Sequence, residues 1–251
     1  MSEHMPRITV IQSSPDVPMD RFAARLGGGV RLVLAFAGEE VPSLAEAGDA
    51  VVVLGGQMSA YADAEAPWLP ATRALLADAA GAGVPALGIC LGAQLLAVAG
   101  SGQVAVAAPP GREAGLVRVR WRDAAAADPV LGPVVAAAAS RAGGGVVSRF
   151  VSMHADAVVE LPPDAVWLGA SAMYPYQAFR LGSALGVQFH PEASVELALR
   201  WAEGHDDVDT AALAAELEPH ADELDAAGAV LADAFLAQVR AHAHAVRAHS
   251  S

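Results

Sequence analysis

Short apolar, β-branched segments alternate with alanine-rich stretches in the first 100 residues, and this alternation constrains the fold more than any other feature of the chain. The spacing of the apolar residues and the local composition indicate strands at 7–12, 30–36, 50–54 and 85–89. They also indicate a helix at 68–83 that ends in glycines. Strands joined through helices form βαβ units, which bury both faces of a sheet under helices. The pattern therefore predicts an α/β fold.

The second half of the chain has a different pattern. Residues 115–121 alternate apolar side chains with arginines, as in a half-exposed antiparallel strand, and Gly182-Ser183 supplies a hairpin turn between two later segments. The segment 123–145 is predicted to be helix or loop. We therefore expect an open mixed, mostly parallel sheet flanked by helices. The later predicted strands are 146–152, 165–171, 177–181 and 184–189.

The last part of the chain reads as an acidic helical extension. Residues 221–248 carry an apolar stripe with the period of one long helix, and 203–225 hold nine acidic residues without a basic one. An acidic run of this kind is either a solvated surface or a docking surface for a basic partner. We predict one domain over 1–203 and an extension over 204–251.

Composition excludes several function classes. The 251 residues have a formal net charge of −13, which argues against binding to nucleic acid. All 15 basic residues are arginines, so neither a Schiff-base lysine nor a phosphate-loop lysine exists. No stretch is long and apolar enough for a membrane span, and the start lacks the features of a secretory signal. We therefore expect no membrane association and a cytoplasmic location.

Cys90, the one cysteine of the chain, lies where the predicted strand 85–89 gives way to a helix. Gly88 and Gly92 flank it in a Gly-x-nucleophile-x-Gly arrangement, which predicts a sharp turn that exposes the thiol above the sheet. The N-terminus of a helix favours thiolate over thiol, and the N–H of Leu91 can receive an oxyanion. A buried structural cysteine is the alternative.

His190 and Glu192 follow the predicted strand 184–189 and supply what a nucleophilic cysteine needs. Residues two apart in an extended segment point to the same side, so Glu192 can hold the imidazole of His190 as a base. His154 follows another apolar strand and either lines a site or has a structural role.

These stretches resemble the class I glutamine amidotransferases, whose glutaminase domain uses a Cys–His–Glu triad. The resemblance covers residues 50 to 200, with GICLGAQLL around the cysteine, VQFHPEAS around the histidine and VVVLGG at 51–56. It implies the fold of that family, which is flavodoxin-like. It also implies that Gly56 joins Leu91 in the oxyanion hole and that Gln94 recognises glutamine. Met153-His154-Ala155-Asp156 is similar to the Ser-His-Gly-Asp stretch of the GMP synthetase glutaminase domain, which implies substrate contacts from Met153 and His154.

The resemblance implies hydrolysis of the glutamine side-chain amide through a γ-glutamyl thioester, without cofactor or metal. The substrate is then glutamine or a γ-glutamyl compound, and the ammonia passes to an acceptor enzyme, such as a synthase subunit. Two alternatives stay open. One is a stand-alone γ-glutamyl hydrolase that acts on a γ-glutamyl amine or peptide, and the other is a non-catalytic regulatory relative.

Overall fold

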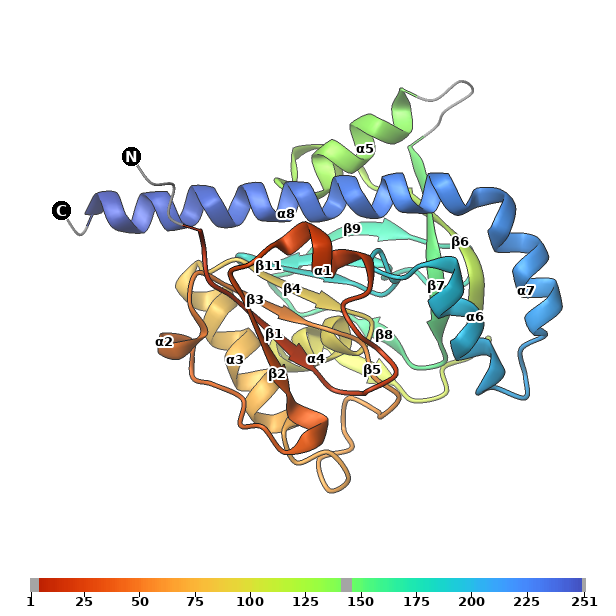
Figure 1. Ribbon diagram of the computed structural model, residues 1–251, viewed down its shortest axis with the longest axis horizontal. Helices are drawn as coiled ribbons and strands as arrows, with labels where there is room; N and C mark the ends of the chain where they lie inside the picture. The colour runs from red at the N-terminus through yellow and green to blue at the C-terminus, as the bar shows by residue number, and fades with distance from the viewer. Residues whose placement is uncertain (1–4, 141–145, 250–251) are drawn as a thin grey trace.

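The structure is a computed structural model that describes residues 5–140 and 146–249, so residues 141–145 of the predicted segment 123–145 lie outside it. Within the described ranges the chain forms a nine-stranded sheet and a separate two-stranded sheet (Figure 1). The small sheet pairs β5 (Gln103–Ala105) with β8 (Ala157–Glu160). The strands of the large sheet, in order across it, are β2 (Val30–Leu34), β1 (Ile8–Gln12), β3 (Ala50–Val53), β4 (Ala86–Ile89), β11 (Ala184–Val187), β10 (Ala178–Leu181), β9 (Val166–Ala170), β6 (Glu113–Trp121) and β7 (Val147–His154).

Strand direction divides the large sheet into two parts. β2, β1, β3, β4 and β11 are parallel, whereas β10, β9, β6 and β7 each run antiparallel to their neighbours. This open mixed α/β sheet confirms the predicted fold class. The carboxyl ends of β3, β4 and β11 lie side by side at one edge, which is where open α/β sheets place their sites.

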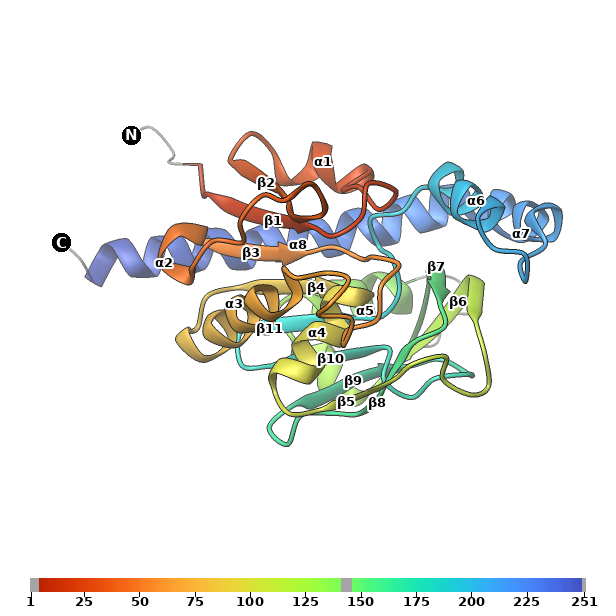
Figure 2. The same cartoon turned by 90° about the horizontal axis from the view of Figure 1, so that it is seen from below.

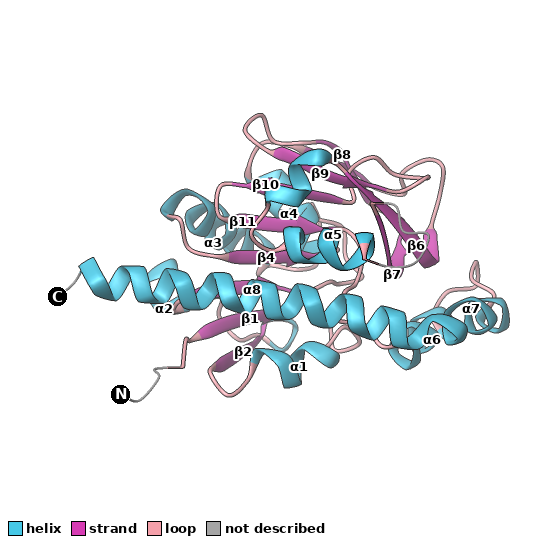
Figure 3. Ribbon diagram, turned by 90° about the horizontal axis from the view of Figure 1, so that it is seen from above, coloured by secondary structure: helices cyan, strands magenta, loops and turns pink. Residues whose placement is uncertain are grey.

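Helices cover both faces of the sheet (Figures 2 and 3). Residues of α1, α5 and α8 pack on one face and residues of α3 and α4 on the other. The helices are α1 (Arg21–Leu26), α2 (Leu44–Ala47), α3 (Leu69–Ala82), α4 (Leu91–Ala99), α5 (Leu131–Ala139), α6 (Val195–Glu203), α7 (Thr210–Leu217) and α8 (Ala221–His249), with 3₁₀ turns at Ala35–Ala37, Asp123–Ala127 and Glu218–His220.

The apolar run of β3 shows why this sheet needs two helical layers. Val52 and Leu54 belong to the cluster under α1 and α8, whereas Val51 and Val53 belong to the cluster under α3 and α4. Successive side chains of a strand point to opposite faces, so a continuous apolar run is stable only when both faces are covered. Each fully buried valine or leucine contributes roughly 1.5–3 kcal/mol by its burial.

The strands predicted at 7–12, 50–54 and 85–89 are confirmed as β1, β3 and β4, each shorter by one residue at one end. The strand predicted at 30–36 is too long, since β2 ends at Leu34 and a 3₁₀ turn follows. Gly38 closes that turn in a left-handed conformation, with φ 89° and its N–H donating to the Ala35 carbonyl at 3.0 Å. After Leu34 the backbone therefore forms this local hydrogen bond and no longer pairs with β1.

The predicted hairpin turn at Gly182-Ser183 is confirmed. Leu181 and Ala184 are paired across β10 and β11, and Gly182 has φ +56°, which suits a two-residue turn. The predicted strand 184–189 is too long, because β11 ends at Val187. The alternating segment 115–121 forms most of β6, paired antiparallel with β7. The short strands β5 and β8 were not predicted.

The helix predicted at 221–248 is α8, which extends to His249. Its stripe packs into the same cluster as the sheet, with Leu231, Phe235 and Val239 fully buried. The proposed division of the chain at residue 203 stays a prediction. Among the described residues, no helix combines the length and apolar character that a membrane span requires.

The acidic run at 203–225 faces arginines of the same chain. Asp207 pairs with Arg112 at 2.9 Å, Glu223 with Arg149 at 3.0 Å, and Asp225 with Arg21 at 3.2 Å. Exposed pairs of this kind contribute roughly 0–1 kcal/mol each. Part of the charge of this segment is therefore balanced within the chain itself.

Candidate active site

Cys90 lies at the turn between β4 and α4. Its backbone has φ 51° and ψ −106°, a conformation that costs a non-glycine residue of order 1–3 kcal/mol. The flanking glycines make the turn possible: a Cβ on Gly92 would meet the carbonyl oxygen of Val53, and one on Gly88 would lie 2.5 Å from the Gly92 carbonyl. The sharp turn predicted from the glycine spacing is therefore present.

The thiol of Cys90 is less exposed than the turn motif suggests. We expected it to stand exposed above the sheet, but Cys90 has a relative exposure of 5%. Helix α4 and the ends of β3 and β11 close around it, and the access that remains is from a cavity that Cys90 lines. The free cysteine is thus buried but lines a cavity.

His190 and Glu192 meet in the arrangement that their spacing predicts. His190 Nδ1 lies 2.7 Å from Glu192 Oε1, and both side chains are buried. The backbone N–H of His190 donates to the Val151 carbonyl at 2.8 Å, which ties this segment to β7. The ring also lies close enough to Cys90 for the two groups to interact electrostatically. Cys90 and Glu192, about a hundred positions apart, therefore both act on a single imidazole.

The charge state of His190 follows from these contacts. Burial, the largest influence, lowers the pKa of His190, but the charges of Glu192 and Cys90 and the hydrogen bonds to both raise it to about 10. The imidazolium is therefore favoured at neutral pH. The charged ring lies beside the sulfur of Cys90.

The glycine pair after β3 lies against the reacting groups. A Cβ on Gly55 would fall 2.9 Å from His190 Cε1 and 3.5 Å from Cys90 Cβ, and one on Gly56 would fall 2.7 Å from Leu91 Cδ2. Gly56 also lines the cavity. Leu91 is the first residue of α4, where backbone N–H groups have no partner within the helix.

A cavity of about 560 Å³ opens onto the nucleophile. Six of the site residues predicted from the sequence line it, and Leu91 and Glu192 do not. Within the part of the chain that the structure describes, no group of three His, Cys, Asp or Glu residues is arranged to hold a metal ion. The six predicted residues are Gly56, Cys90, Gln94, Met153, His154 and His190.

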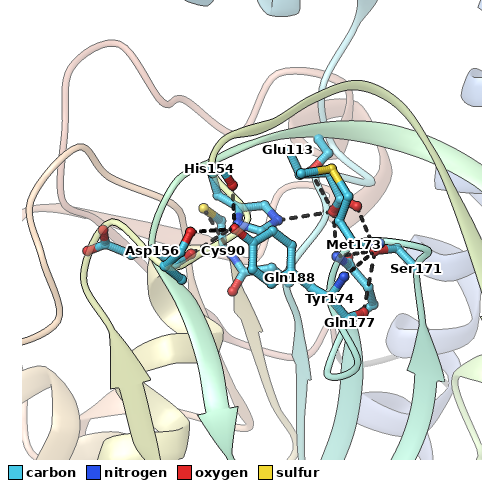
Figure 4. A network of polar contacts seen from close by, with 12 residues as sticks. Cys90, Glu113, His154, Asp156, Ser171, Met173, Tyr174, Gln177 and Gln188 are labelled. Carbon is cyan, nitrogen blue, oxygen red and sulfur yellow. Dashed lines mark hydrogen bonds and ion pairs between the residues drawn. The ribbon is translucent and has the colours of Figure 1, made fainter.

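A chain of hydrogen bonds runs from the sulfur along the floor of this cavity (Figure 4). Gln188 Nε2 donates to Cys90 Sγ at 3.6 Å, and Gln188 Oε1 accepts from Gln94 Nε2 at 3.4 Å. Gln94 Nε2 also donates to the carbonyl oxygen of Asp156 at 2.9 Å. A carbonyl oxygen can only accept, so this contact fixes which end of the Gln94 amide faces it. The carbonyl oxygen of Gln94 is thus turned away from the Asp156 carbonyl oxygen.

His154 both lines the cavity and is held structurally, so its two sequence interpretations are compatible. Its ring nitrogens lie 3.0 Å from the Asp156 carbonyl oxygen and 3.2 Å from Glu113 Oε2. Met153 lines the same wall with a relative exposure of 8%. The segment predicted from the resemblance to contact the substrate is therefore beside the nucleophile.

Several residues of the site were not predicted from the sequence. Gln188 lies two positions before His190, a spacing that places both side chains on one side of an extended segment and gives a usable signal. Glu113 is in phase with the buried residues of β6, a pattern that marks an acid turned inward. Arg112 and Trp201 line the cavity without a signal in their local sequence.

The fold and the site together define an α/β enzyme with a cysteine at a strand-to-helix turn. The chain belongs to the class I glutamine amidotransferase family, because the family model described as "Glutamine amidotransferase class-I" matches residues 27–198. This confirms the resemblance stated from the sequence motifs.

Individual relatives agree with this assignment. Over 146 residues the chain is 35% identical to GMP synthase (glutamine-hydrolyzing) of Thermomicrobium roseum, in an alignment that covers 57% of this chain and 23% of that protein. A glutamine amidotransferase of Thermotoga maritima superposes with a TM-score of 0.77 at 24% identity, covering 94% of this chain and 99% of that one. A glutamine amidotransferase of Methylobacillus flagellatus superposes with a TM-score of 0.77 at 25% identity. This superposition covers 95% of this chain and 96% of that one.

Proposed function

We propose that this chain hydrolyses the side-chain amide of glutamine through a Cys90–His190–Glu192 triad and releases ammonia for an acceptor enzyme. The observation that carries the proposal is the single imidazole of His190, whose Nδ1 lies 2.7 Å from Glu192 Oε1 and whose pKa is raised by both Glu192 and Cys90. Cys90 and His190 line the cavity together with Gln94 and His154.

In the first half of the reaction, the Cys90 thiolate attacks the side-chain amide carbon of glutamine. The oxyanion that forms accepts hydrogen bonds from the N–H groups of Leu91 and Gly56. His190 donates its proton to the amide nitrogen, the C–N bond breaks, and ammonia leaves a γ-glutamyl thioester on Cys90. Glu192 stabilises the imidazolium and holds the ring in place.

In the second half, neutral His190 removes a proton from water as the water attacks the thioester carbonyl. The tetrahedral intermediate breaks down to glutamate and the Cys90 thiolate, and His190 is protonated again for the next cycle. Atoms and charge balance with water as the one co-reactant, which is consistent with our expectation that no cofactor or metal takes part.

The experiment is an assay of glutamate release from glutamine by wild type, Cys90→Ala and His190→Ala. We expect both variants to lose activity while keeping the fold, because each change removes a side chain at the edge of the sheet. His242→Ala, a histidine on α8 away from the cavity, is the matched control and should keep full activity. Glutamate release that survived Cys90→Ala would end the assignment of the nucleophile, and a wild type that is inactive both alone and with its co-purified proteins would favour a regulatory relative.

A stand-alone γ-glutamyl hydrolase is the second candidate, and the size of the cavity favours it. Its volume of about 560 Å³ lies within the roughly 300–1,000 Å³ typical of sites for drug-sized ligands, which exceed glutamine in size. Turnover of a γ-glutamyl amine by the chain alone would support this candidate. Activity on glutamine that depends on a co-purified protein would support delivery of ammonia to a synthase subunit. A free thiol nucleophile is best preserved in a reducing compartment, so we propose the cytoplasm as its location.

A further inference from the structure

Glu113, at the start of β6, is a buried carboxylate that does not line the cavity. Its relative exposure is 7%, and among the described residues its partners are hydrogen-bond donors from three neighbouring segments (Figure 4). Ser171 Oγ donates to Oε1 at 2.6 Å, and Oε2 accepts from Gln177 Nε2 and Ser152 Oγ. No arginine is among these contacts, and the remaining partner of Oε2 is His154.

His154 lies directly opposite Glu113 in the antiparallel pairing of β6 with β7. Nε2 of its ring is 3.2 Å from Glu113 Oε2, and Nδ1 is 3.0 Å from the carbonyl oxygen of Asp156. Both neighbours are acceptors. A neutral imidazole has one N–H, so donation to both acceptors at once takes an imidazolium. A buried imidazolium needs a partner of opposite charge, and the carboxylate of Glu113 supplies it.

The Asp156 carbonyl carries this arrangement into the substrate cavity. It accepts from His154 Nδ1 and also from Gln94 Nε2 at 2.9 Å, so two donors from different elements hold one oxygen. While His154 donates, the 153–156 segment stays in place and Gln94 presents its carbonyl oxygen to the cavity. Without the second proton, the Nδ1 lone pair can face the Asp156 oxygen, and the two acceptors repel each other.

We propose that Glu113 is a positioning residue of this site: it keeps His154 protonated on both nitrogens and thereby fixes Asp156 and Gln94 for the substrate. The effect on glutamine binding rests on the proposed function. The protonation of the His154 ring does not depend on it. The position of Asp156 and Gln94 at the cavity would then depend on Glu113, a carboxylate that contacts neither the cavity nor Cys90.

The first test reads the ring directly, by ¹⁵N nuclear magnetic resonance of the histidine side chains at neutral pH. We expect His154, assigned by its loss in His154→Asn, to carry protons on both nitrogens in wild type and on one in Glu113→Gln. A neutral His154 in wild type, or an unchanged ring in Glu113→Gln, would overturn the proposal. Glu160→Gln, which removes an exposed carboxylate from β8, is the control and should leave the ring unchanged.

The second test measures glutamine binding by calorimetry in a Cys90→Ala background, where no turnover occurs. Loss of a charge-assisted hydrogen bond should weaken binding about tenfold in Glu113→Gln, and the same change should have no effect when His154→Asn is already present. The alkylation rate of Cys90 by iodoacetamide, measured in proteins that retain Cys90, should not change. An equal loss of affinity with and without His154, or slower alkylation, would refute action through His154. If Cys90→Ala does not bind glutamine, the proposed function fails, and the ring measurement still decides the role of Glu113.

Discussion

The charge of Glu192 offers the most direct test of how the site works. Glu192→Gln keeps the shape of the side chain and its oxygen near His190 Nδ1, now 2.7 Å from Oε1, but removes the negative charge. A pKa raised from 6.5 to about 10 corresponds to roughly 5 kcal/mol in favour of the imidazolium, shared between Glu192 and Cys90. A charged hydrogen bond contributes about 1.5–3 kcal/mol, so kcat/KM for glutamine should fall about 10- to 150-fold.

The pH dependence distinguishes this cause from general damage. His190 must be protonated to release ammonia, so activity is lost as pH rises through its pKa. Without the charge of Glu192 that pKa moves down from about 10 toward 6.5, and the alkaline limb of kcat/KM should move to lower pH. The assay is glutamate release across this interval, with Glu203→Gln on α6 as the control. An alkaline limb at the same pH in wild type and Glu192→Gln would refute the reasoning, whatever the loss of rate.

Two further predictions concern stability. Because the pKa of His190 is raised from 6.5 to about 10 on folding, its stabilising contribution is complete below pH 6.5 and is lost as pH rises through 10; Tm should fall over this interval, and less steeply in Glu192→Gln, so equal slopes would contradict the coupling. Gly92→Ala should lower the free energy of unfolding by about 1–3 kcal/mol in urea, since the new Cβ meets the Val53 carbonyl. Gly81→Ala is the control and should not lower the free energy of unfolding, because a Cβ there meets open space. Similar urea midpoints for both variants would show that the turn at Cys90 accommodates the extra methyl group without cost.

The parallel half of the fold could be predicted from the sequence because its signals are local. β3 and β4 are uninterrupted apolar runs and β1 is mostly β-branched, and the candidate site residues come soon after strand ends, with Cys90 after β4 and His190 three residues after β11. Parallel strands bring their carboxyl ends to one edge, so contact between these two residues follows from the topology. The burial of the thiol could not be predicted, because α4 and the neighbouring strand ends create it together.

The antiparallel half depends on register, which the sequence specifies only weakly. Glu113 and His154 meet because β6 and β7 pair them directly, 41 positions apart along the chain. A shift of one residue would turn both side chains to the opposite face. No local pattern sets that register, so the sequence indicates at most that an acid at 113 is in phase with buried neighbours.

The two halves therefore differ in what they determine about activity. Cys90, His190 and Glu192, the triad that we propose, are held by strand ends and one tight turn. The cavity wall formed by Met153 and His154 is held by a cross-strand pair and by the Asp156 carbonyl, which accepts from Gln94. On the function that we propose, we expect substitutions of the Glu113–His154 pair to change the preference between glutamine and a γ-glutamyl amine before they change the chemistry at Cys90.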